Sequence, residues 1–426
     1  MSGDAISPRY TTSGRSRPPL VRAFLVSLVF AGRALAAEPE AEAGPTLTWS
    51  GYAEAEGMLF LERPAYAGQR RHDGSLALSP QMEARWEDGP RFVLNLFGRL
   101  DAADPHRTHA DVREAMLTVP GDGWEVGLGI GKVFWGVAES VHLVDIVNQT
   151  DRVENIDLEE KLGQPMASVK LVRDFGTLEA FYLPWFREQR FPSTRGRLRT
   201  DPVVDDDLST VGRRTTPLRP DVALRFSTTL EAWDVGLSYF NGTSREPTLR
   251  PVLDRGGRLV FAPEYERISQ WGIDVQHTSG PWLLKFEGIH RRGQKDRFGI
   301  ERSFTAFVAG AEYLLPQVFG SGIDVTLVGE YVRDSRRDAS WSAFENDLFL
   351  GARFALNDAA GTTGKISLTQ DLDTPSRLLN IEASRRLNDS MTVNLEARFF
   401  MNTRPKDLLN FIRRDDYVRL SLRQYF

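Results

Sequence analysis

The sequence predicts an all-β fold: an antiparallel up-and-down sheet closed into a transmembrane barrel of about sixteen strands, with eighteen as the other count considered. Two observations carry this prediction. Apolar and polar residues alternate with period two over windows of nine to eleven residues, longer than the strands common in soluble sandwiches. No apolar run is long enough for a membrane helix, although 26% of the residues are charged. A barrel reconciles these facts, because only every second strand residue must face lipid.

The N-terminus has the pattern of a secretory signal peptide. Arg15, Arg17 and Arg22 precede the apolar run Ala23–Gly32, and Ala34–Ala37 supplies small residues for cleavage. A membrane anchor is the alternative, but about ten apolar residues are too few to cross a bilayer as a helix. We therefore expect residues 1–36 to be removed, 37–46 to form a short lead, and 47–426 to form the barrel.

Charge and cysteine content exclude some classes of function. Residues 1–36 carry five Arg and one Asp, a net charge of +4, so the expected mature chain has −9 where the whole chain has −5. An acidic chain of this kind does not resemble a nucleic-acid binder, and we expect no nucleic-acid partner. Cys is absent, which excludes disulfides and thiolate metal sites.

The alternation recurs along the whole chain. It is clearest in 391–401, where Met391, Val393, Leu395, Ala397 and Phe399 share one parity. Windows with the same period include 76–86, 92–101, 233–239, 270–276, 323–331 and 417–426. The longer windows, of nine to eleven residues, can cross the apolar layer as tilted strands.

The connections between these windows fall into two classes. Tight turns are expected at 120–123, 174–177, 278–281 and 387–390, where Gly, Asn and Asp suit hairpin geometry. Long loops are expected at 132–166, 186–220 and 241–266. Short turns on the periplasmic side and long loops on the outer side are typical of transmembrane β-barrels.

The last ten residues, Tyr417–Phe426, form an amphipathic strand that ends on an aromatic residue. This strand resembles the closing strand of Gram-negative outer-membrane β-barrels, and the pattern as a whole resembles porin-like channels as a class. The resemblance implies a bacterial outer-membrane location, contact with lipids and lipopolysaccharide, and passage of small solutes. It also implies that the barrel-assembly machinery recognises Phe426. A homotrimer, which is common among porins, is compatible with the resemblance.

If apolar rows face lipid, the opposite rows line the interior. These rows are densely ionic, and burying so many charges in a dry core would cost several kcal/mol per unpaired ion, whereas a water-filled lumen removes that cost. Cross-strand salt bridges that only stiffen the wall are the alternative. The expected lumen-lining residues are Glu83, Asp101, Lys285, Glu287, Glu330, Arg353, Glu396 and Arg398, together with others such as Glu54, Glu56, Lys365, Glu382, Arg419 and Arg423.

Segment 132–166 interrupts the alternation and is rich in acid. Porins fold a long loop inward at a comparable place, so we expect a pore-constricting loop whose acidic rim faces wall cations across an aqueous gap. An ordinary solvated loop is the alternative. The expected constriction residues are Asp145, Asp151, Glu154, Asp157 and Glu159 on the loop and Arg85, Arg99 and Arg113 on the wall.

Other interpretations of the loops remain open. Residues 151–160 offer oxygen ligands for Ca²⁺ but lack the glycine and terminal glutamate of an EF-hand; no other metal or cofactor is expected. The arginine-rich loop 186–220 could bind anionic solutes or lipopolysaccharide phosphates, or could pair with its own acids. Ser140, His142 and Asp145 superficially suggest a hydrolase, but no nucleophile motif accompanies them, so we expect no enzyme activity. Fatty-acid transport and polysaccharide export are the alternative barrel functions.

Overall fold

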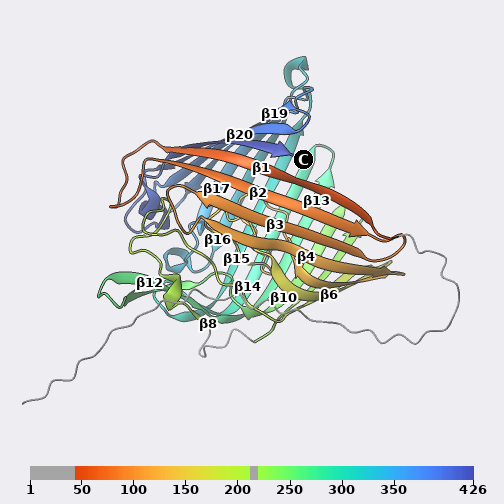
Figure 1. The fold of residues 1–426 in the computed structure, drawn as a ribbon, viewed down its shortest axis with the longest axis horizontal. Helices are drawn as coiled ribbons and strands as arrows, with labels where there is room; N and C mark the ends of the chain where they lie inside the picture. The colour runs from red at the N-terminus through yellow and green to blue at the C-terminus, as the bar shows by residue number, and fades with distance from the viewer. Residues whose placement is uncertain (1–43, 212–218) are drawn as a thin grey trace, which may run out of the picture. The chain divides into compact units, whose positions relative to one another are not determined.

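A computed structural model describes residues 44–211 and 219–426. The expected signal peptide lies outside the described residues and stays a prediction. Within them, eighteen antiparallel strands form one closed sheet (Figure 1), which confirms the predicted fold class and the higher of the two strand counts. The first and last strands close the barrel, with Tyr52 opposite Tyr425 and Phe60 opposite Tyr417.

The barrel strands follow one another around the sheet in chain order. Their bounds are β1 Thr46–Phe60, β2 His72–Arg85, β3 Arg91–Asp101, β4 His109–Gly121, β5 Trp124–Gly131, β6 Gln164–Arg173, β7 Gly176–Leu183, β9 Asp221–Leu230, β10 Trp233–Thr243, β13 Arg267–Ser279, β14 Trp282–Lys295, β15 Glu301–Leu315, β16 Asp324–Asp334, β17 Asn346–Ala355, β18 Thr363–Asp371, β19 Arg377–Asn388, β20 Met391–Met401 and β21 Tyr417–Tyr425.

The period-two pattern gives the wall two different faces. On β20, Leu395 is 38% exposed and points outward, whereas its neighbour Glu396 is 8% exposed and points inward. Leu420 lies opposite Leu395 on β21 and continues the outer apolar row. A single-residue slip in register would exchange the two faces, so the alternation itself fixes the register. The exposed apolar rows suit hydrocarbon, as the sequence predicts.

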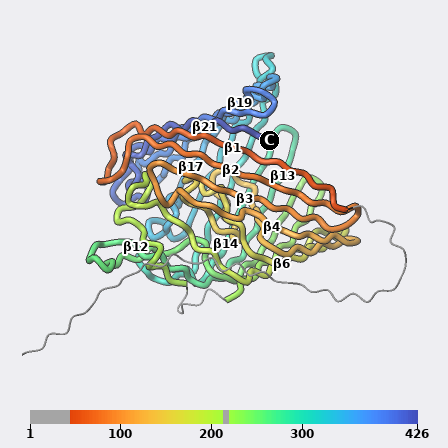
Figure 2. The backbone as a smooth tube through the Cα atoms, viewed as in Figure 1, coloured from red at the N-terminus to blue at the C-terminus, as the bar shows by residue number. Residues whose placement is uncertain are grey.

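Short turns join the strands at one end of the barrel. Between β4 and β5, Gly121 lies opposite Trp124, so the turn consists of Asp122 and Gly123, with a positive φ of 67° at Gly123. Asp-Gly is a favoured pair for a two-residue hairpin turn because the glycine accepts positive φ without strain. The longest connections, at 132–163, 184–220 and 244–266, lie at the other end of the barrel (Figure 2).

Small elements lie in the connections. β8 Thr210–Val211, β11 Thr248–Leu253 and β12 Leu259–Tyr265 form a separate three-stranded sheet at the long-loop end. Four 3₁₀ turns are described: η1 Asp206–Leu208, η2 Val318–Gly320, η3 Arg337–Ala339 and η4 Leu408–Ile412. In the described parts of the chain, no helix has the length and apolarity needed to cross a membrane.

Candidate functional site: the channel lumen

Residues 132–163, between β5 and β6, form a loop that enters the barrel; we call them the inward segment. Its two ends are tied together by Asn148. The side-chain amide of Asn148 donates to the carbonyls of Gly131 and Leu162, both at 2.9 Å, and its oxygen accepts the Val133 amide at 2.8 Å. One buried side chain thus satisfies backbone groups that the strand ends leave unpaired.

Two wall carboxylates bind the backbone of the inward segment. Glu287 on β14 accepts the amides of Val137, Ala138 and Val144 at 2.7, 2.9 and 3.3 Å. Glu330 on β16 accepts the amides of Glu139 and Ser140, both at 2.8 Å. Both glutamates point inward, as the sequence analysis expected, but they are covered by the segment and act as anchors for it.

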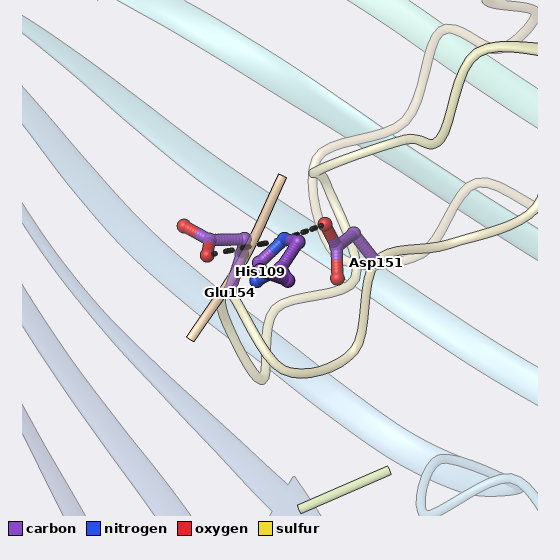
Figure 3. Close-up of side chains that lie close together, drawn as sticks. All are labelled: His109, Asp151 and Glu154. Atoms are coloured by element: carbon purple, nitrogen blue, oxygen red, sulfur yellow. Dashed lines mark hydrogen bonds and ion pairs between the residues drawn. The ribbon is translucent and has the colours of Figure 1, made fainter. Parts of the chain in front are cut away.

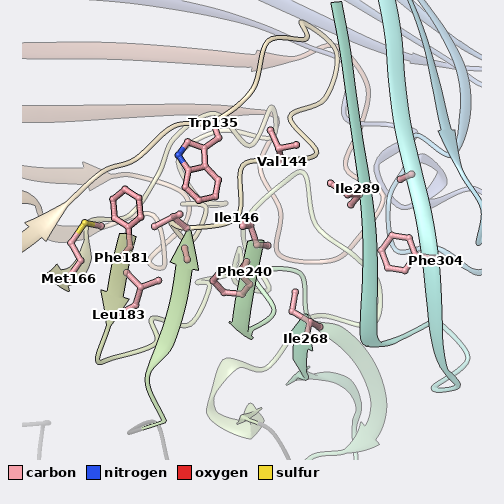
Figure 4. Close-up of a cluster of buried hydrophobic side chains, with 13 residues drawn as sticks. Trp135, Val144, Ile146, Met166, Phe181, Leu183, Phe240, Ile268, Ile289 and Phe304 are labelled. Atoms are coloured by element: carbon pink, nitrogen blue, oxygen red, sulfur yellow. The ribbon is translucent and has the colours of Figure 1, made fainter. Parts of the chain in front are cut away.

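Apolar side chains complete this attachment. Trp135, Val144, Ile146 and Val147 of the inward segment pack against inward-facing residues of β6 to β15, including Met166, Phe181, Leu183, Phe240, Ile268, Ile289 and Phe304 (Figure 4). Val144 is fully buried. Dry packing of this kind stabilises the segment by roughly 1.5–3 kcal/mol for each large side chain that it buries. We call the wall from β6 to β16, with the residues packed on it, the dry half.

The acidic part of the inward segment meets the opposite wall through direct ion pairs. Asp151 contacts Arg113 of β4 at 2.5 Å, and Glu154 contacts Arg99 of β3 at 2.9 Å. Asp157 contacts Arg398 of β20 at 2.9 Å. The sequence analysis placed an aqueous gap between these acids and the wall cations; that expectation is wrong for these pairs, because the groups touch. They hold the segment across the lumen.

The wall from β17 through β21 to β4 is charged, and we call it the wet half. Arg99 contacts Glu54 at 3.1 Å and Glu56 at 3.5 Å as well as Glu154. Arg107, in the connection from β3 to β4, contacts Glu56 at 2.7 Å and Asp101 at 3.0 Å. Neighbouring carboxylates thereby share cations, which offsets much of their desolvation cost.

Other predicted residues have separate partners. Glu396 binds Tyr417, Arg419 and Arg398. Arg353 contacts Glu139 of the inward segment at 2.7 Å and pairs with Glu312, which also pairs with Lys285.

Two predicted constriction residues do not reach the opposite wall. Asp145 pairs with Lys161 within the inward segment at 3.0 Å. Arg85 pairs with Glu83 on its own strand at 2.6 Å, its side chain is 63% exposed, and among the described residues it has no hydrogen bond or ion pair with the inward segment. The expectation that Arg85 faces the acidic rim is therefore wrong. Arg85 ends β2 at the short-turn end, a position that parity alone does not reveal.

His109, Asp151 and Glu154 lie close enough to suggest a metal site (Figure 3). The His109 Nε2 atom is 3.2 Å from Asp151 and 3.7 Å from Glu154. The two carboxylates also bind Arg113 and Arg99, which already supply positive charge there. Burial would raise the pKa of Asp151, but the hydrogen bond to His109 and the positive charge of Arg113 stabilise its ionised form, so its pKa is lowered. The arrangement is an ion-pair network that needs no metal.

The Ca²⁺ alternative at 151–160 does not fit the geometry. Asp151 and Asp157 turn to different arginines. The Asn155 amide nitrogen donates to Asp157, and its oxygen accepts the Ile156 amide. The oxygens therefore do not converge on one point, as Ca²⁺ requires.

Two cavities open on either side of the inward segment. The outer chamber lies toward the long loops and the inner chamber toward the short turns; both are open to solvent. Six residues line both chambers and mark where they adjoin; we call them the neck. They are Glu154, Asn155, Glu159, Lys365, Glu382 and Arg419.

Comparisons with known proteins place the fold. No protein-family model and no curated protein matches the chain. Among solved structures, it is similar to OccD3 (OpdP) of Pseudomonas aeruginosa, with a TM-score of 0.50 and 12% identity over 90% of this chain and 93% of that one. A mutant porin of Rhodopseudomonas blastica matches with a TM-score of 0.41 and 11% identity, over 89% of this chain and all of that one. The likeness to OccD3 and the closed eighteen-stranded sheet show that the chain has the fold of a porin-like β-barrel.

Proposed function

We propose that the protein is an outer-membrane channel that passes small polar or charged solutes through a hydrated lumen. The observation that carries this proposal is the neck: two solvent-open chambers adjoin there, beside ionised side chains of the wall and of the inward segment. Barrels of sixteen to eighteen strands are wide enough to leave an aqueous path. The inward segment narrows that path from one side.

The outer surface supports a membrane location. Apolar side chains exposed on the outside form rows that suit lipid, and aromatic residues such as Trp124, Trp233, Trp282 and Phe426 lie at or beside the short-turn end. Such residues favour the membrane–water interface. Phe426 is 61% exposed beside the last strand, where an assembly factor could reach it; recognition by the assembly machinery and a homotrimer remain proposals.

Lipopolysaccharide remains a candidate partner for the long loops. Several arginines of 186–220 already have internal partners, however. Arg187 contacts Asp111 at 2.7 Å, and Arg197 contacts Asp415 at 2.6 Å. These contacts favour the interpretation that the described arginines of the loop pair with acids of this chain over the interpretation that they bind lipopolysaccharide phosphates.

The alternative functions have less support. A fatty-acid path needs an apolar passage, whereas the neck residues are polar or charged. A hydrolase would need Ser140 oriented by His142, but the Ser140 hydroxyl donates to Glu330 at 2.5 Å and Asp145 pairs with Lys161. Nothing in the described lumen favours a polysaccharide over a small solute.

The test is conductance of the purified protein in planar bilayers, with swelling of proteoliposomes in sugars and organic ions. We expect discrete ohmic current steps and solute entry that declines with solute size. Silence in repeated insertions of correctly folded barrel, shown by heat-modifiable migration in gels, would contradict the proposal.

A further inference from the structure

The charges that remain free in the lumen differ between its two ends. We call a charged side chain free when it is exposed and has no ion pair with any described residue. In the outer chamber, apart from the neck, the free side chains are Arg70, Arg152 and Arg195. At the neck and in the inner chamber they are Glu159 and Glu160.

Most other ionic groups of the chambers are neutralised locally. In the outer chamber, Arg197 pairs with Asp415, and Arg245 with Asp221. In the inner chamber, Arg423 pairs with Glu54 at 2.6 Å.

The less exposed groups near the free charges have local partners too. Asp104 is buried and accepts the backbone amides of His106 and Ser193. Asp73 accepts the amide of Gly74. At the neck, Lys365 and Glu382 lie directly opposite each other on β18 and β19 and so offset each other. Among the exposed side chains, therefore, the unpaired charge is positive in the outer chamber and negative at the neck.

This order of charge has a consequence for solutes. At physiological ionic strength the Debye length is about 8 Å, so each group of free charges acts mainly on its own surroundings. Anions gather at the outer arginines and are repelled at Glu159 and Glu160, and cations meet the reverse sequence. A solute with separated positive and negative groups meets an attractive partner at both places.

We propose that the lumen is polarised along its axis and favours dipolar solutes, whose anionic group is attracted at Arg70, Arg152 and Arg195 and whose cationic group is attracted in turn at Glu159 and Glu160. This inference rests on the proposed channel function and names the class of solute that the channel prefers. Arg152 is the central residue, because it belongs to the inward segment, only seven positions before Glu159.

The first experiment measures current rectification in planar bilayers at 0.1 M KCl. Currents of opposite polarity in oriented channels are expected to differ by about 1.5-fold or more, because free charge of opposite sign enriches different ions at the two ends. The ratio should approach one at 1 M KCl, where the Debye length is about 3 Å. R70Q/R152Q/R195Q and E159Q/E160Q should each reduce the ratio. R292Q and E231Q are matched controls, since both residues are exposed but line neither chamber.

The second experiment compares solute entry in proteoliposomes, using taurine as the dipolar probe. Isethionate replaces the ammonium of taurine with a hydroxyl, and choline and erythritol supply a cation and a neutral solute. Taurine is expected to enter at least about twofold faster than isethionate, and the E159Q/E160Q variant should remove that advantage. Conducting channels with symmetric currents and no preference for taurine would overturn this inference alone, whereas absence of conductance would overturn the proposed function.

Discussion

The two halves of the lumen hold the same loop by different physics. In the dry half, apolar side chains of the inward segment pack against β6 to β15, and two buried glutamates bind its backbone. In the wet half, its acids meet arginines of β3, β4 and β20 in ion pairs beside open chambers. The dry half therefore fixes the position of the loop, while the wet half leaves charged side chains beside the path of the solute.

The largest effect is expected at Arg99, which joins the inward segment to the wet half. Arg99→Met leaves Glu54, Glu56 and Glu154 buried without their shared cation. Removing one partner of a buried ion pair costs about 3–5 kcal/mol. Arg423→Met is the matched control, because Arg423 is 33% exposed and pairs with Glu54 alone; it should cost about 1 kcal/mol or less. Thermal unfolding in detergent measures both, and equal losses would show that the network does not act as a unit.

A second prediction tests the anchor in the dry half. Glu287→Ala removes the acceptor of three backbone amides, which can bind water only if the segment moves away from the wall. The inward segment should loosen, and single-channel conductance should rise by about twofold or more. Glu287→Gln retains an acceptor oxygen and should change conductance much less. Unchanged conductance in the alanine variant would mean that the apolar cluster alone holds the loop.

The neck should respond to pH through Glu159. Partial desolvation at the neck, together with nearby Asp157 and Glu382, raises the pKa of Glu159, while Lys365 and Arg398 oppose the shift. A raised pKa means that Glu159 binds its proton at a higher pH than an ordinary glutamate, so cation preference should fall as pH is lowered from 7 toward 5. Reversal potentials in a KCl gradient report this change. Glu159→Gln should flatten the dependence, and an unaltered pH profile in that variant would assign the titration to another group.

The smallest effect is expected at Glu345, which precedes β17 at the rim of the wet half. Burial and the acids Asp347, Asp371 and Asp338 raise the pKa of Glu345 to about 8. The folded protein therefore retains a proton that the unfolded chain releases near its ordinary pKa, so this group lowers stability as pH rises from about 4.5 through 8. At pH 9, Glu345→Gln should have a free energy of unfolding about 1 kcal/mol above that of the unmodified protein, and so a higher unfolding temperature, with little difference at pH 4. A difference that does not vary with pH would contradict this assignment.

The sequence predicts the strands of the barrel wall better than it predicts the contacts of the inward segment inside the barrel. Period two identifies the strands and their faces, because lipid demands an apolar row, and segment 132–166 is recognisable because it breaks that period. The ion pairs of Asp151, Glu154 and Asp157 depend on which strands the loop reaches, and spacing along the chain carries no such information. For the packing in the dry half, the sequence contains one local indication: Val141–Val147 is rich in apolar residues although it lies in a loop. Phe240 and Ile268 have the inward parity of their strands, where the alternation predicts polar residues, so the pattern does not indicate that they pack against a loop.

Labelling of introduced cysteines tests most directly whether the lumen has a dry half and a solvent-open neck. The chain contains no Cys, so each introduced thiol is the only one that can react. Glu159→Cys lies at the neck, and Val144→Cys lies in the dry half, where Val144 has no exposed surface. A charged methanethiosulfonate reagent should change the single-channel current of the Glu159→Cys variant and leave that of the Val144→Cys variant unaltered. Equal modification of both positions, or no modification of the Glu159→Cys variant in conducting channels, would contradict the account.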